Sequence, residues 1–232
     1  MNRSASTFLP LSLVLAGCPS FSTMGTARTL PEGKTQIFVS PQVAYTRQWN
    51  IAGLEPQTNV VYPQFELGIH HGVNESVEVG AKLWLLGFEI DSKVQLHRSP
   101  SEDEGIDVAV DPGMGYMAFY QEQSAGTTSI SASQNTISLY LPVLVGFNFK
   151  GGSQLILGPK LIDQIILPSS TTGAGNVLWG GASLGYAWKV GNFRLLPEVS
   201  VVYPMGVVQK SGATFSFGGI AVQGGVGLLF GG

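Results

Sequence analysis

The chain is poor in charge, and the little charge it has is nearly balanced. Charged residues make up 12% of the 232 residues, about half of the roughly 25% that soluble domains carry. The 12 Lys and Arg residues against 15 Asp and Glu residues leave a formal net charge of −3, so there is no basic surface for a nucleic acid. We therefore expect no nucleic-acid partner. The low charge also excludes a disordered chain that its own charge keeps extended.

Cysteine and long apolar runs are scarce too, whereas glycine is abundant. The single cysteine, Cys18, can form no internal disulfide. From Lys34 onward no apolar run is long enough for a transmembrane helix, and no stretch has the period of an amphipathic helix. The 31 glycines are about twice the usual share. Because they follow no Gly-X-Y period, collagen is excluded.

Residues 1–17 have the features of a secretory signal peptide. Arg3 precedes an apolar stretch over 8–15 that is too short to span a bilayer as a permanent helix. The residues Leu15-Ala16-Gly17 then stand directly before Cys18. This arrangement resembles the lipobox of bacterial lipoproteins, and the resemblance implies cleavage before Cys18 and a lipid on its thiol and new amino group. The alternative is an ordinary signal peptide followed by a free, buried cysteine.

Residues 18–33 show no periodicity and are predicted to be a lipidated N-terminal tether, ahead of a single domain over 34–232. Pro19 follows Cys18, in the place where an Asp in enteric lipoproteins favours retention in the inner membrane. This difference favours the outer membrane of a Gram-negative bacterium, with the lipidated N-terminus on the periplasmic side. Outer-membrane lipid is then an expected partner.

The rest of the chain alternates between apolar and polar residues with a period of two, broken by turn residues. Phe65, Leu67 and Ile69 share one face, for example, while Glu66 and Gly68 share the other. Ten strands are predicted on this basis, an even number as in bacterial outer-membrane barrels: 34–47, 59–70, 76–86, 88–98, 106–120, 135–149, 154–167, 177–189, 193–204 and 215–230.

The predicted connections are short on the periplasmic side and mostly long on the outer side, as in outer-membrane barrels. The periplasmic turns are 71–75, 99–105, 150–153 and 190–192, and the outer loops are 48–58, 86–88, 121–134, 168–176 and 205–214. The pattern resembles small outer-membrane β-barrel proteins with a lipoprotein signal. The resemblance implies an all-β fold, a closed antiparallel transmembrane β-barrel of about 10 strands in an up-and-down meander.

Aromatic residues gather near both ends of the predicted strands, as interfacial rings do in membrane barrels. The outer girdle is expected to contain Tyr45, Tyr116, Tyr120 and Tyr203, and the periplasmic girdle Phe147, Phe149, Trp188, Phe193 and Phe230. Aromatic residues also cap strands in soluble β-sandwich cores, so this placement alone does not decide between the two folds.

Prolines inside the predicted strands favour a different fold. A closed barrel has no edge strand to accept a proline, so bulges are expected at Pro41, Pro159 and Pro197. These residues favour the alternative of a periplasmic lipoprotein whose soluble β-sandwich binds a ligand or partner.

The face opposite the apolar one carries charge that a barrel would enclose. Because an unpaired buried charge costs several kcal/mol, we expect these side chains to pair and fill the lumen. The barrel would then have a structural, adhesive or assembly-partner role; the alternative is a narrow channel for small solutes or cations. The predicted lumen charges are Glu66, Glu78, Lys82, Glu89, Asp91, Lys93, Asp107, Asp111, Lys160, Arg194 and Glu198.

No pattern indicates an enzyme. Ser183 lies in a G-x-S-x-G sequence, a motif of one hydrolase fold. That fold needs a histidine later in the chain than the serine, but His70, His71 and His97 all come earlier. Omptin-type outer-membrane proteases place their His–Asp pair at the outer rim, whereas these histidines are predicted at the periplasmic end. We expect no cofactor and no metal. Other envelope proteins are expected to contact the periplasmic turns or the outer loops.

Overall fold

The computed structural model describes residues 20–50, 57–125, 128–168, 174–209, 216–217 and 219–232. Every regular element in this part of the chain is a strand, and no helix there is long and apolar enough to cross a membrane. The strands are β1 (Thr35–Asn50), β2 (Gln57–Asn74), β3 (Val77–Trp84), β4 (Gly87–His97), β5 (Gly105–Val110), β6 (Gly113–Ala125), β7 (Thr128–Phe149), β8 (Ser153–Leu167), β9 (Gly175–Val190), β10 (Phe193–Gln209), β11 (Ser216–Phe217) and β12 (Ala221–Gly231).

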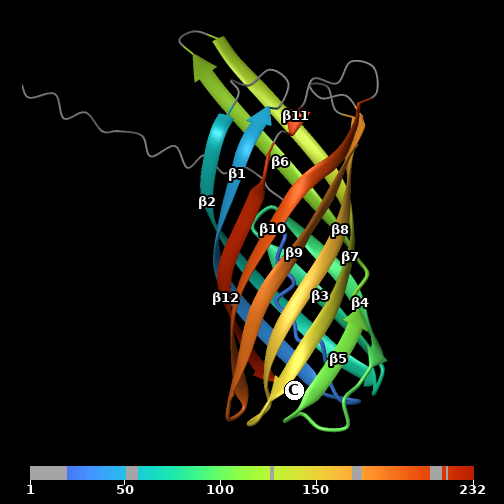
Figure 1. Cartoon of the computed structure of the whole chain (residues 1–232). Coiled ribbons are helices and arrows are strands. Elements are labelled where there is room, and N and C mark those ends of the chain that lie inside the picture. Colours follow the sequence, from blue (N-terminus) through green and yellow to red (C-terminus); the bar gives the residue numbers. More distant parts are fainter. Residues whose placement is uncertain (1–19, 51–56, 126–127, 169–173, 210–215, 218) are drawn as a thin grey trace, which may run out of the picture.

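These strands form one closed barrel in which each strand is antiparallel to its neighbours (Figure 1). Strands β5 and β6 follow one another between β4 and β7 and share one position in the wall. Strands β11 and β12 likewise share one position beside β1. The twelve labelled strands therefore form a ten-stranded barrel. The meander of ten strands predicted from the sequence is confirmed. Because the sheet closes on itself through β1 and β12, the alternative of a two-sheet sandwich is wrong.

The two faces of the wall have opposite polarity. Outward side chains such as Val61, Leu83 and Leu157 are apolar and exposed, whereas inward ones such as Gln164 and Glu66 are polar and buried. This is the reverse of a soluble protein and is what a barrel surrounded by lipid requires. The alternation of period two therefore sets both the strands and the face of each strand that meets the membrane.

The prolines are accommodated without the expected bulges. Pro41 pairs with Phe65, Pro159 with Ala182 and Pro197 with Val226, each in unbroken register. In an antiparallel strand the N–H of each residue points to one neighbour only, so a proline removes one bond on one side. The register shifts occur elsewhere, beside Gly72, Gln95 and Pro204.

The wall is uneven in height. The predicted outer loop 121–134 is mostly strand, because β6 and β7 continue as a hairpin to Ala125 and Thr128. The β3–β4 hairpin instead turns early, at Leu85 and Leu86, so that residues 57–65 of β2 pair with β1 alone among the described strands. Figure 1 shows this contrast, with the β6–β7 hairpin rising well above β3 and β4.

The expected aromatic residues lie on the outer surface. Tyr116, Tyr203, Phe149, Trp188 and Phe230 are exposed, and Tyr45, Phe147 and Phe193 are half-buried. The side chain of Tyr120 lies outside the described part. Tyr186, which the sequence analysis did not select, joins the periplasmic group through contacts with Phe149 and Trp188, with ring centroids 6.1 and 4.6 Å apart.

Candidate functional site

Residues 20–31, which we call the plug, run through the inside of the barrel (Figure 1). The sequence analysis places these residues in a lipidated tether, but from Ser20 to Leu30 nearly every side chain is buried by the lumen wall. The plug begins beside Glu66 and ends beside Glu78, near the periplasmic turn between β2 and β3. The lumen is therefore filled by the chain's own N-terminal segment.

An apolar side chain occupies every third position of the plug, at Phe21, Met24, Ala27 and Leu30. Phe21 packs into the outer apolar cluster of the lumen, where its ring centroid is 5.6 Å from that of Trp179. Met24 and Ala27 pack into a second cluster nearer the periplasm, around Phe38, Leu144, Ile156, Ala187, Leu196 and Leu229. The sequence analysis missed this period of three, which matches neither the 3.6-residue period of an α-helix nor the two-residue period of a β-strand.

Lumen side chains accept the hydrogen bonds of the plug's backbone N–H groups. The plug forms no strand with the wall, so its buried backbone needs side-chain partners. The bonds run from Phe21 N to Gln223 (2.7 Å), Thr23 N and Met24 N to Glu198 (2.8 and 2.9 Å), Ala27 N to Gln154 (2.8 Å), Thr29 N to Gln95 (2.7 Å) and Leu30 N to Glu78 (2.7 Å).

Lumen cations donate to the plug's carbonyl oxygens in the same way. Lys160 Nζ donates to Phe21 O at 2.6 Å, and Lys82 Nζ donates to Ser22 O at 3.0 Å. Nearer the periplasm, Arg98 donates to Thr29 O at 3.1 Å. Side chains of the wall thus supply both donors and acceptors to the backbone of the plug.

The plug also contributes charge and hydroxyl groups of its own. Arg28 forms an ion pair with Asp107, with Nε 2.9 Å from Oδ2. Ser20 and Ser22 both donate their hydroxyl hydrogens to Glu66. Neither Arg28 nor these serines was selected from the sequence as a lumen residue, because the lumen was assigned to strand residues alone.

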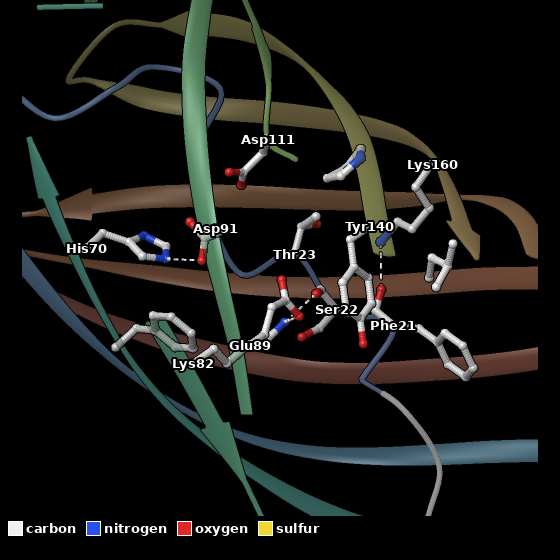
Figure 2. Close-up of a pocket in the computed structure, with 13 residues that line it drawn as sticks. Phe21, Ser22, Thr23, His70, Lys82, Glu89, Asp91, Asp111, Tyr140 and Lys160 are labelled. Atoms are coloured by element: carbon white, nitrogen blue, oxygen red, sulfur yellow. Dashed lines mark hydrogen bonds and ion pairs between the residues drawn. The ribbon is translucent and has the colours of Figure 1, made fainter. Parts of the chain in front are cut away.

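The eleven predicted lumen charges all point into the barrel. Lys82 pairs with Glu89 at 3.1 Å, and Lys93 pairs with Glu78 at 2.7 Å. Glu66, Asp107, Lys160 and Glu198 bind the plug, as described above. Asp91 and Asp111 lie beside this network (Figure 2), and Arg194 lies at the periplasmic mouth.

Little space remains among these side chains. The cavity shown in Figure 2, between the plug and the residues Lys82, Glu89 and Asp111, has a volume of about 20 Å³. That is room for about one water molecule. The described side chains around this cavity therefore leave little free space beside the plug.

The catalytic patterns considered from the sequence have no supporting geometry. Ser183 lies inside β9, and its Oγ is 3.1 Å from Thr23 Oγ1 of the plug. His70 is buried in the lumen, 3.2 Å from Glu78, whereas the neighbouring His71 is exposed on the opposite face. Among the described residues no group of three or more His, Cys, Asp or Glu side chains could hold a metal ion.

Solved structures similar to this chain are outer-membrane barrels. The outer membrane protease OmpT from Escherichia coli matches with a TM-score of 0.51 at 10% identity, over 89% of this chain and 100% of that one. The COG4313 outer membrane channel from Pseudomonas putida F1 gives a TM-score of 0.48 at 9% identity, over 90% of this chain and 98% of the other. The translocator domain of the autotransporter NalP from Neisseria meningitidis gives 0.47 at 14% identity, over 87% and 89%.

These likenesses concern the fold and leave the activity open. No family model matches the sequence, and no curated protein matches it. At 10% identity, the similarity to OmpT shows that this chain has an outer-membrane barrel fold.

Proposed function

We propose that this protein is a lipid-anchored outer-membrane barrel that its own plug keeps closed, with a structural, adhesive or assembly-partner role in the cell envelope. The observation that carries the proposal is the match between lumen charges and the plug's backbone, at Glu198, Glu78, Lys160 and Lys82. A lumen built to hold a peptide does not conduct while that peptide is in place. The proposal assigns the barrel no catalytic activity.

Planar-bilayer conductance tests the closed state. We expect the full chain to be silent and a variant lacking residues 20–31 to conduct. The seven acids and four bases among the predicted lumen charges would make the opened pore prefer cations. Conductance of the intact protein would contradict a closing role for the plug.

The alternative role, a narrow channel for small solutes or cations, requires the plug to leave. Lys82 is the residue to test, because its ammonium group donates to the plug and also pairs with Glu89 on the lumen wall. In the plug-less barrel, Lys82→Glu should increase the preference for cations. A plug-less barrel that is folded but silent would exclude the channel.

Lipid anchoring at Cys18 is tested by metabolic labelling with an alkyne fatty acid, with Cys18→Ala as the control. The anchor and the plug constrain each other, because Cys18 precedes Ser20 by only two residues, about 7 Å of chain. Ser20 binds Glu66, eight residues along β2 from Asn74, which is about 20 Å from the periplasmic end in a tilted strand. A lipid in the inner leaflet and a plug seated in the lumen therefore exclude each other, so in the proposed closed state the lipid on Cys18 must enter the membrane farther from the periplasm.

A disulfide distinguishes these two arrangements. Thr23 Oγ1 and Ser183 Oγ are 3.1 Å apart, so Thr23→Cys with Ser183→Cys should lock the plug in the lumen. If protein labelled with the fatty acid also forms this disulfide, the lipid reaches the membrane while the plug stays in the lumen. If only the Cys18→Ala form is cross-linked, the lipid holds the N-terminus on the periplasmic side and the plug outside the lumen.

A further inference from the structure

The periplasmic mouth of the barrel encloses a cavity of about 540 Å³ that the plug does not fill. It lies between the lower end of the plug, the β9–β10 turn and Glu102 of the β4–β5 turn. Its volume is within the range of small-molecule sites, roughly 300–1,000 Å³. Leu30, Pro31 and Phe193 contribute apolar surface to its lining.

The charge of this cavity is strongly biased. Its lining contains the basic side chains of Arg28, Lys34, Lys189 and Arg194, whereas Glu102 contributes the one acidic side chain. The carboxylate of Glu102 lies 3.0 Å from Lys189, 3.9 Å from Arg28 and 4.0 Å from Arg194. One carboxylate cannot neutralise three cations, and Asp107 takes up only the charge of Arg28.

Of the lining cations that are largely shielded from solvent, Arg194 has the weakest compensation. Its side chain is 19% exposed, and within the described structure Glu102 is the one carboxylate within 4.0 Å of it. A guanidinium offers five N–H donors in a planar fork that suits carboxylate and phosphate oxygens. A charge this far from solvent favours a second anion beside it.

We propose that this mouth binds an anionic ligand from the periplasm, one that carries two or more carboxylate or phosphate groups. Arg194 and Lys189 would hold one anionic group, and Lys34 would face another at the rim. Glu102 would be displaced from these cations when the ligand binds. Because Arg28 belongs to both the plug and the cavity, an occupied site would also contact the end of the plug.

Isothermal titration of the detergent-folded full chain with citrate and with pyrophosphate tests this site. We expect saturable binding that weakens with salt, and a loss of about tenfold or more in Arg194→Gln, the size expected for charge-assisted bonds. Lys150→Gln is the matched control, because Lys150 is an exposed cation of the periplasmic β7–β8 turn outside the cavity lining. Glu102→Gln should bind more tightly, because it removes the competing carboxylate.

Two results would overturn the proposal. One is the lack of saturable binding of either probe to the folded protein. The other is an equal loss in Arg194→Gln and Lys150→Gln, which would indicate attraction to overall charge. Folding of each variant is checked by its heat-dependent gel mobility, and Lys189→Gln replaces Arg194→Gln if the latter does not fold. Citrate binding without pyrophosphate binding would identify carboxylates as the ligand class, and the reverse result phosphates.

Discussion

Glu198 shows how a single lumen carboxylate holds the plug. It accepts hydrogen bonds from Thr23 N, Met24 N and the Thr23 hydroxyl, at distances of 2.8 to 3.1 Å. Met24 adopts the left-handed backbone conformation, with φ of 41°, which a residue with a side chain keeps only where its surroundings hold it. Glu198 therefore stabilises both the position and the unusual conformation of the plug.

Replacing Glu198 by Ala should loosen the plug without opening the wall. Two buried N–H groups would lose their acceptor, a cost of about 3 kcal/mol. We expect faster proteolysis within residues 20–31 in the folded barrel, measured by mass spectrometry of the fragments. Glu198→Gln, which keeps an acceptor oxygen, should lie between wild type and Glu198→Ala. An unchanged cleavage rate in Glu198→Ala would contradict the holding role.

Glu102 gives the periplasmic turn a dependence on pH. Its hydrogen bond from Lys189 lowers the pKa of this carboxyl below its ordinary value. A depressed pKa in the folded state stabilises the fold above the ordinary value, near pH 4.3, and this contribution is lost as the pH falls through the lower value. NMR of the turn should show it loosening at acidic pH in wild type. In Glu102→Gln the mobility of the turn should be the same above and below that pH range.

At the scale of the strands, inward glycines make room for large side chains on the neighbouring strand. A Cβ added at Gly68 would lie 2.1 Å from a ring carbon of Phe38, on the paired strand β1. Phe38 in turn packs against His70, with ring centroids 5.5 Å apart. At this position the lack of a side chain on glycine therefore permits close packing of the inner wall.

Gly68→Ala should therefore destabilise the barrel by about 1–3 kcal/mol, because Phe38 must shift in a packed lumen. Gly206 in β10 is the matched control, since a Cβ there would meet nothing within 4 Å. Urea unfolding of both variants from lipid vesicles gives the comparison. Equal stability of Gly68→Ala and Gly206→Ala would show that the ring of Phe38 is free to move.

The whole molecule is held together by closure of the sheet between β1 and β12. Apart from residues 57–65 of β2, this closure leaves no free strand edge at which unfolding can start, so the barrel should resist detergent until heated. On a gel, unboiled protein extracted from membranes should migrate faster than boiled protein. A single band at the same position before and after boiling would contradict the closed barrel.

The number of strands, their outward faces and the inward charges could be predicted from the alternation of apolar and polar residues. On each strand, one set of alternate side chains faces the membrane and is apolar, and the other set faces the lumen and is polar. Even Lys82 and Glu89, which meet across a hairpin, could be placed inside by their phase. This information is local, so one sequence suffices to read it.

The plug and the cavity at the mouth could not be read in this way. Phe21 N bonds to Gln223, 202 residues away, and Ser22 bonds to Glu66, 44 residues away. These partners come together only once the sheet closes around the N-terminal segment. Arg28, Lys189, Arg194 and Glu102 likewise share the periplasmic mouth because of barrel closure, which no periodicity along the chain encodes.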